Sequence, residues 1–234
     1  MFTALLNLTR RSADAALSNS PGLTGLYAKL SSLRNHPWPD VPLDKGRFII
    51  FDTETTGLSC NKGDEIISLG AVEICDGQIT GSSFTHLVNP NRAIPPVASE
   101  ITGISDEMVS DSPDVLTVLD RFLEFAGPTH LVAHNAHFDL SFINSKLRKY
   151  CGQRLRNPTL DTYLLSHLLF PYRRSHSLDS LANHFGVPLE GRHTALGDSL
   201  ITARIFLEMT GSLVSRGIKT TSQLTSYLEF RRLI

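Results

Sequence analysis

Short apolar runs alternate with amphipathic stretches along most of the chain. The run RFIIFD, residues 47–52, is the kind of short apolar segment that forms a buried strand. The dipeptide Asp76-Gly77 is a strong hairpin-turn signal between two further β-type segments. We therefore predict strands, besides 47–52, at 65–75, 78–88 and 129–135.

Helical spacing dominates between and after these strands. Two short helices are predicted near 97–101 and 106–109, and longer ones at 114–126, 138–150, 161–169, 177–185 and 194–210. Within one of them, Phe138, Phe142, Ile143 and Leu147 fall on a single face. A β-meander is thus followed by alternating helix and strand, and then by helices. This order predicts an α/β fold in which helices cover a mixed sheet.

Both ends of the chain differ from this pattern. Residues 1–46 are interpreted as a helical N-terminal extension and linker, with helical spacing in 1–17 and 23–34 and a proline-rich stretch at 36–46. Residues 47–211 form the predicted main domain. Residues 212–234 form a predicted C-terminal helical tail.

Composition narrows the class of protein. The chain has 234 residues, which suits one α/β domain with an extension, and 22 basic against 23 acidic residues give a net charge of −1. This balance argues against a strongly basic DNA-coating protein. Near-neutrality still allows a nuclease, because such an enzyme needs only a local basic rim around an acidic, metal-binding site.

Cysteine usage and hydropathy indicate the compartment. Three cysteines, Cys60, Cys75 and Cys151, form no CxxC pair, which argues against a disulfide framework or a structural zinc site. No stretch approaches the roughly 18 apolar residues of a membrane span. The basic pair Arg10-Arg11 follows the first apolar run, whereas a secretory signal has its basic residues before that run. We expect a cytoplasmic protein that does not contact membranes.

The first candidate chemical group is the pair Asp52 and Glu54. Residues two apart on a strand point to the same face, and this pair stands at the carboxyl end of an apolar strand, where α/β sheets commonly bind ligands. Gly57, shortly after, would allow a close backbone approach to a substrate. Taken alone, a DxE pair is more often two solvated acids at a strand end.

Two later segments carry further acids. Asp139 stands in the first turn of a predicted helix, where simple stabilisation of the helix end is an equally good explanation. Asp198 lies on a largely apolar helix face with Ala195 and Ile201, and such acids are rarely buried unless they are paired or bound to metal. His193 precedes this helix; a lone histidine is more often structural, but beside an activated water it is a natural general base.

Taken together, the acids of the three segments indicate a site for divalent cations. If these segments converge, their carboxylates repel one another strongly, and a pair of divalent cations is the usual remedy. Such a pair commonly hydrolyses phosphodiester bonds. Oxygen ligands of this kind suit Mg²⁺ and Mn²⁺ better than zinc.

Three motifs carry a resemblance to a known family. FDTETTGL (51–58), HNAHFD (134–139) and HTALGD (193–198) resemble, in order, the three motifs of the DEDDh exonucleases, the DNA polymerase III epsilon or DnaQ-like group of the RNase H-like superfamily. The resemblance covers about residues 47–210. One departure is Thr102, where relatives often have histidine.

The resemblance implies a fold and a set of roles. The fold would be an RNase H-like mixed β-sheet of about five strands flanked by helices. Two Mg²⁺ or Mn²⁺ ions would be held by Asp52, Glu54, Asp139 and Asp198, with Asp52 bridging them, and His193 would take a proton from the attacking water. The implied reaction is 3′→5′ exonucleolytic hydrolysis that releases nucleoside 5′-monophosphates.

The resemblance also implies a substrate-binding surface. It comprises the following residues: Thr55, Thr56, Gly57, Leu58, His134 and Asn135. Leu58 would act as a wedge against the terminal base, whereas Phe138 is expected in the core. Arg173, Arg174 and His176 would contact trailing phosphates or form a solvated surface cluster.

The expected partners follow from these roles. They are single-stranded or frayed 3′ ends of DNA or RNA, a polymerase as a partner subunit, and a second copy of the chain in a homodimer. A non-catalytic nucleic-acid-binding or polymerase-associated subunit is the alternative. The presence of all five motif residues argues against that alternative.

Overall fold

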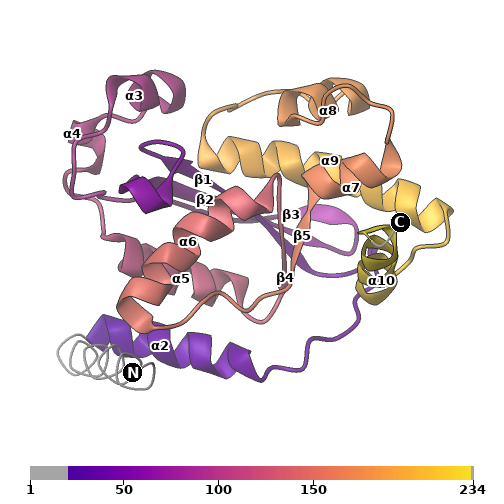
Figure 1. The fold of residues 1–234 in the computed structure, drawn as a ribbon, viewed down its shortest axis with the longest axis horizontal. Coiled ribbons are helices and arrows are strands. Elements are labelled where there is room, and N and C mark those ends of the chain that lie inside the picture. Colours follow the sequence, from indigo (N-terminus) through magenta and orange to yellow (C-terminus); the bar gives the residue numbers. More distant parts are fainter. Residues whose placement is uncertain (1–20, 233–234) are drawn as a thin grey trace.

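A five-stranded mixed sheet lies between two groups of helices in the computed structural model, which describes residues 21–232 (Figure 1). The strand order is β3-β2-β1-β4-β5. β1 and β2, and β2 and β3, are antiparallel, whereas β4 runs parallel to both β1 and β5. The strands are β1 Phe48–Thr55, β2 Ile66–Cys75, β3 Gln78–Leu87, β4 His130–Ala133 and β5 Thr159–Asp161. The predicted fold class is confirmed.

Helices are found at every predicted position within the described residues. They are α2 Pro21–Arg34, α3 Pro96–Thr102, α4 Asp106–Val109, α5 Val115–Ala126, α6 Ala136–Cys151, α7 Thr162–Leu169, α8 Leu178–Phe185, α9 Ala195–Ser215 and α10 Thr221–Arg232, with a short 3₁₀ turn at Cys60–Lys62. The helical spacing in 1–17 lies outside the described residues. β5 had no strand prediction of its own, because three residues are too short for an alternating pattern.

Successive side chains of β1 point alternately into two hydrophobic cores, one on each side of the sheet. Ile49 and Phe51 are buried with α2, α5 and α6 on one side of the sheet. Phe48 and Ile50 are buried with α7, α8 and α9 on the other side. Figure 1 shows these two groups of helices on opposite sides of the sheet. Because side chains alternate along a strand, the even-numbered acids that follow point to the α9 side.

The segment before β1 is part of the packed structure. Leu26 and Leu30 of α2 are fully buried in the core shared with α5, and Lys29 Nζ lies 2.9 Å from Asp120 Oδ1. Further along, Leu43 N donates to Lys219 O at 2.9 Å, beside an isolated β-bridge between Pro42 and Thr220. The stretch predicted as a linker is therefore anchored beside the start of α10.

These contacts bear on the predicted domain organisation without deciding it. The division into 1–46, 47–211 and 212–234 stays a prediction. Within the described residues, α2 shares its core with the sheet, and α9 continues to Ser215 across the predicted boundary. No helix between residues 21 and 232 is both long enough and apolar enough to cross a bilayer.

Candidate active site

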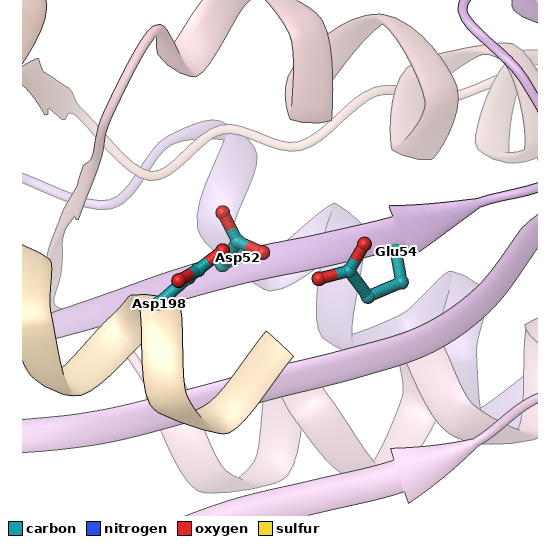
Figure 2. A group of neighbouring side chains, drawn as sticks. All are labelled: Asp52, Glu54 and Asp198. Atoms are coloured by element: carbon teal, nitrogen blue, oxygen red, sulfur yellow. The ribbon is translucent and has the colours of Figure 1, made fainter. Parts of the chain in front are cut away.

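Three carboxylates from two elements meet at the end of β1. Asp52 and Glu54 lie on β1, and Asp198 lies in the first turn of α9 (Figure 2). One carboxylate oxygen from each residue lies within 4.8 Å of the others. Asp198 is buried, with 5% of its surface exposed, although its helix face is otherwise apolar. The expected convergence of the first and third motifs is therefore present.

The first turn of α9 is held tightly against β2, which places Asp198. Gly70 of β2 has no room for a side chain, because a Cβ atom there would lie 2.3 Å from the carbonyl carbon of Ala195. Ser199 Oγ donates to Gly70 O at 3.1 Å. Thr194 caps the helix by accepting from Gly197 N at 3.1 Å. The position of Asp198 thus follows from close packing between a helix start and a strand glycine.

Asp139 reaches the site from the opposite face of β1. Its Oδ1 accepts hydrogen bonds from Thr53 N at 2.9 Å and from Thr53 Oγ1 at 2.6 Å, and the residue is 2% exposed. Thr53 is odd-numbered and therefore points to the α6 side, away from its two acidic neighbours. Asp139 is not one of the three mutually close acids, and its role as a metal ligand stays a prediction.

Burial and mutual repulsion raise the pKa of these acids and so favour their protonated forms. Burial raises the pKa of Asp52 well above its usual value, and repulsion from Asp139, Asp198 and Glu54 adds to this. Burial, reinforced by Asp198, raises the pKa of Glu54 to about 7. Burial likewise raises the pKa of Asp139 to about 7, against the hydrogen bonds from Thr53. A crowded, oxygen-only set of this kind fits divalent Mg²⁺ or Mn²⁺.

Arg192 supplies part of the missing positive charge. Its Nη1 lies 2.5 Å from Asp198 Oδ2, while Nε and Nη2 lie 2.8 and 3.2 Å from the two carboxylate oxygens of Asp179. Asp179 on α8 thus holds the guanidinium over the site. The sequence analysis missed both residues. The available signal was a basic residue directly before His193.

His193 is exposed beside the cluster in an unusual backbone conformation. Its φ of 65° lies in the left-handed region, which non-glycine residues seldom adopt. Its backbone N donates to Asp198 Oδ1 at 3.4 Å, and Arg192 Nη1 donates to its Nδ1 at 3.2 Å. Because arginine can only donate, a neutral His193 ring here carries its proton on Nε2. For Nε2 to accept a proton, Arg192 must first release Nδ1, so that the ring proton can be on Nδ1 instead.

The residues after β1 form a compact turn. Thr55 Oγ1 donates to Gly57 O at 2.7 Å, and Thr56 Oγ1 accepts from Glu65 N at 3.0 Å. A Cβ atom on Gly57 would lie 2.5 Å from Asp64 Oδ2, so this glycine has a packing reason of its own. Leu58 is 87% exposed, as a wedge against a base would require. The substrate contacts of these residues stay predictions.

Asp161 organises the second motif, and the sequence analysis missed it too. Its carboxylate accepts from Asn135 N at 2.9 Å and from Ala136 N at 3.1 Å, which fixes the turn before α6. His134 Nδ1 lies 2.9 Å from Thr162 Oγ1, and burial lowers the pKa of His134 to about 4. His134 is therefore neutral near pH 7. Substrate contacts of His134 and Asn135 stay predictions.

The three basic residues before the third motif, Arg173, Arg174 and His176, differ in exposure and in contacts. His176 is 6% exposed, its Nδ1 lies 2.7 Å from Ser166 Oγ, and its ring stacks on His167. Arg173 is bound to the chain that follows it, because its Nε donates to Ser175 O at 2.8 Å and its Nη2 donates to Ser180 O of α8 at 2.5 Å. The burial of His176 excludes it from the expected solvated surface cluster, and phosphate contact by this group of residues stays a prediction. Arg174 is exposed.

Two further residues have packing roles. Phe138 packs on the core with its ring centroid 5.1 Å from that of Phe142, which confirms the core expectation. Thr102 is buried, and its Oγ1 donates to Ala98 O at 2.8 Å and accepts from Ile104 N at 3.2 Å. Thr102, where relatives often have histidine, thus has a role in local packing.

Sequence comparisons identify the family of this chain. A model of the exonuclease family RNase_T matches residues 49–206. The DNA polymerase III subunit epsilon-like protein of Rhodobacter capsulatus is 46% identical over 184 residues, which cover 77% of this chain and 26% of that protein. DNA polymerase III subunit epsilon of Rickettsia felis is 35% identical over 77% of this chain and 83% of its own length. The chain spans 26% or less of the first curated relatives it matches.

Solved structures show the same fold. Exonuclease X in complex with 5′ overhanging duplex DNA aligns with a TM-score of 0.58 and 29% identity, over 70% of this chain and 92% of that one. The nuclease domain of 3′hExo, a DEDDh family member bound to rAMP, aligns with a TM-score of 0.62 and 20% identity, over 71% and 92%. The expected RNase H-like sheet is confirmed. The chain belongs to the DEDDh exonuclease family, within its DNA polymerase III epsilon-like group.

Proposed function

We propose that this chain is a metal-dependent 3′→5′ exonuclease. Its substrate would be the 3′ end of single-stranded or frayed DNA, with RNA as the alternative, and its product nucleoside 5′-monophosphates. One observation carries the proposal: three carboxylates from β1 and α9 lie within 4.8 Å of one another, and Arg192 compensates their charge only in part. Such a cluster is costly to keep ionised unless cations occupy it.

Two Mg²⁺ or Mn²⁺ ions would be held by the four acids of the three motifs. When bound, they would polarise the scissile phosphate, lower the pKa of the attacking water and stabilise the leaving 3′ oxygen. Asp52 would bridge the two sites, with Glu54 and Asp198 on one of them. Asp139 would contribute its Oδ2 to the other, since Thr53 occupies its Oδ1.

The remaining site residues would position the terminal nucleotide and take the proton from the attacking water. His193 would accept a proton at Nε2 once Arg192 releases Nδ1, and its exposure leaves it free to turn toward a bound strand. Leu58 would pack against the terminal base, because an 87% exposed leucine just beyond β1 has apolar area to bury. The backbone of Thr55 to Gly57, together with His134 and Asn135, would line the terminal nucleotide pocket.

The partners belong to the same proposal. The polymerase III names of the bacterial relatives support association with a polymerase and a cytoplasmic location. A homodimer stays a prediction that light scattering would test. The alternative, a non-catalytic polymerase-associated subunit, is favoured by the same names, but the complete acid cluster argues for catalysis.

The decisive experiment uses purified protein with Mn²⁺ on DNA and RNA oligonucleotides of matched sequence, labelled at the 5′ end. Stepwise shortening of the labelled strand, with mononucleotide release, would support 3′→5′ hydrolysis and report the sugar preference. Asp52→Asn is the matched inactive control. If the natural protein and this variant leave both substrates intact, the enzymatic proposal is wrong and the non-catalytic alternative stands.

A further inference from the structure

A second concave site lies away from the acid cluster. It is a cavity of about 390 Å³ between the end of α2, the outer face of α6 and the loop that leads into β5. Figure 1 shows that loop running between α6 and α2. The lining residues that carry the argument are Arg34, Trp38, Arg148, Arg154, Arg156 and Asn157.

The topology separates this cavity from the catalytic acids. The cavity reaches Thr159, the first residue of β5, whereas the acids stand near the carboxyl end of β1. β1, β4 and β5 are parallel, so the cavity lies at the amino-terminal ends of these strands and the acids lie at the carboxyl-terminal end. On α6, Arg148 also follows Asp139 by nine residues, about 13 Å along the helix axis. The two sites are therefore distinct.

The cavity carries uncompensated positive charge. Of the described residues, four arginines line it and no aspartate or glutamate does. Among residues 21–232, the ion pairs involve other cations, and none includes Arg34, Arg148, Arg154 or Arg156. Such a cluster repels itself, so a bound anion would stabilise it.

Two of the lining residues each have a buried polar atom without a hydrogen-bond partner in the described part of the protein. The Nε of Arg156 is buried and has no hydrogen-bond partner within the described part of the chain. Asn157 is 6% exposed, and its Nδ2 donates to Gly127 O and Thr129 O at 2.9 and 2.8 Å, while its Oδ1 has no partner among residues 21–232. Buried polar groups are normally paired, so a donor and an acceptor left unpaired on two neighbouring lining residues are consistent with a ligand at this site.

The walls of the cavity are held in place by the protein itself. Leu155 N donates to Asn144 Oδ1 at 2.8 Å, which fastens the loop to α6. Gln153 Nε2 donates to Ser31 Oγ at 3.0 Å, which fastens it to α2. Leu33 and Leu155 are buried beneath. The loop that carries two of the arginines is therefore preformed, as ligand pockets usually are.

We propose that this cavity binds a nucleotide unit through its phosphate. Arginine forks match phosphate oxygens in bidentate geometry, and four of them suit a multiply charged group better than a single carboxylate. Trp38 offers an aromatic surface on which a base stacks. The cavity volume suits a ligand of nucleotide size. The phosphate belongs either to a free mononucleotide or to a nucleic-acid strand that runs over this face.

Trp38 provides a direct test, because it is the single tryptophan of the chain and lines the cavity. Its fluorescence would be followed in EDTA, without hydrolysis, while thymidine 5′-monophosphate or a short oligothymidylate is added. The variant Arg148→Gln/Arg154→Gln removes two exposed lining arginines, and Arg121→Gln/Arg216→Gln removes two exposed arginines elsewhere. We expect saturable binding that weakens at least tenfold in the first variant and stays unchanged in the second.

The outcomes separate the two sources of phosphate. Binding of the mononucleotide indicates a free-nucleotide site, whereas binding of the oligonucleotide alone indicates a strand site. For a strand site, the plot of log K against log salt should flatten by about 1.4 in the first variant, roughly 0.7 for each lost phosphate contact. Equal binding by the natural protein and the first variant, an equal loss in the second, or equal competition by polyglutamate would overturn the proposal.

Catalysis serves as an independent readout. The Arg148→Gln/Arg154→Gln variant should hydrolyse a dinucleotide with Mn²⁺ at the natural rate, because neither arginine touches the acid cluster. If the natural protein does not hydrolyse the dinucleotide, the proposed function fails, while the fluorescence titration in EDTA still decides the cavity. The two proposals therefore fail separately.

Discussion

Arg192 Nη1 lies 2.5 Å from Asp198 Oδ2, so a protein cation holds one of the predicted metal ligands. Replacing it by Arg192→Gln should have opposite effects without and with metal. In EDTA the free energy of unfolding should fall, by at most about 3 kcal/mol, because a buried carboxylate loses its partner. The affinity for Mn²⁺ should rise, since the cation no longer competes with the guanidinium. Thermal melts and calorimetric titration measure both changes.

The matched control for Arg192 is Arg121→Gln, which removes an exposed arginine from α5. Asp179→Asn should act in the same direction as Arg192→Gln but more weakly, because it frees the guanidinium without removing it. An unchanged Mn²⁺ affinity in Arg192→Gln would contradict competition between the arginine and the metal.

Stability without metal should decline as the pH rises. The pKa of Glu54 is raised from 4.5 to about 7 in the folded state, so the folded protein binds more protons than the unfolded chain between these values. By linkage, stability is highest below pH 4.5 for this group and is lost as the pH rises toward about 7. Melting in EDTA across this range should show the decline, and Glu54→Gln should flatten it. A flat profile in the natural protein would contradict the raised pKa.

Metal should reverse the repulsion among the acids. Millimolar Mn²⁺ should raise the Tm of the natural protein, because ligands that bind only the folded state stabilise it. Asp52→Asn should abolish both this rise and nuclease activity. The variant should melt at the same or a higher temperature in EDTA, since one repelling charge is gone. A full metal-induced rise in Asp52→Asn would remove this residue from the site.

Gly70 should be intolerant of any side chain. Gly70→Ala would push a Cβ atom against the backbone of Ala195 and displace the helix start that carries Asp198. We expect a loss of about 1–3 kcal/mol in stability, as for other overpacked sites, together with lower activity. Gly81→Ala on β3 is the control, because nothing lies within 4 Å of its added Cβ. Urea unfolding compares the two, and equal stabilities would refute the close approach.

Leu58 should matter for substrate and hardly for folding. Leu58→Ala removes an 87% exposed side chain, so its free energy of unfolding should change by less than about 0.5 kcal/mol. If Leu58 packs against the terminal base, kcat/KM on an oligonucleotide should fall severalfold. Val97→Ala, which alters another exposed apolar residue, is the control. Natural kcat/KM in Leu58→Ala would rule out the wedge.

Local patterns predicted most of the fold because they report local physics. The apolar run in RFIIFD, the Asp76-Gly77 turn and the apolar face of α6 each depend on neighbouring residues alone. β5 was missed because its three residues make no pattern. The stretch 36–46 was interpreted as a linker because its prolines suggest a turn, whereas its anchoring depends on residues 219–221, far away in the chain.

The sequence by itself determined the three motifs and, through the two-residue period of a strand, that Asp52 and Glu54 share one face. Only the tertiary structure decided that Asp198 joins them while Asp139 binds Thr53 from the other face. It also decided that Arg192 reaches back over the cluster and that four arginines gather near the opposite ends of the parallel strands. Side-chain direction follows from local backbone geometry, whereas the charge around a site depends on which distant elements pack beside it.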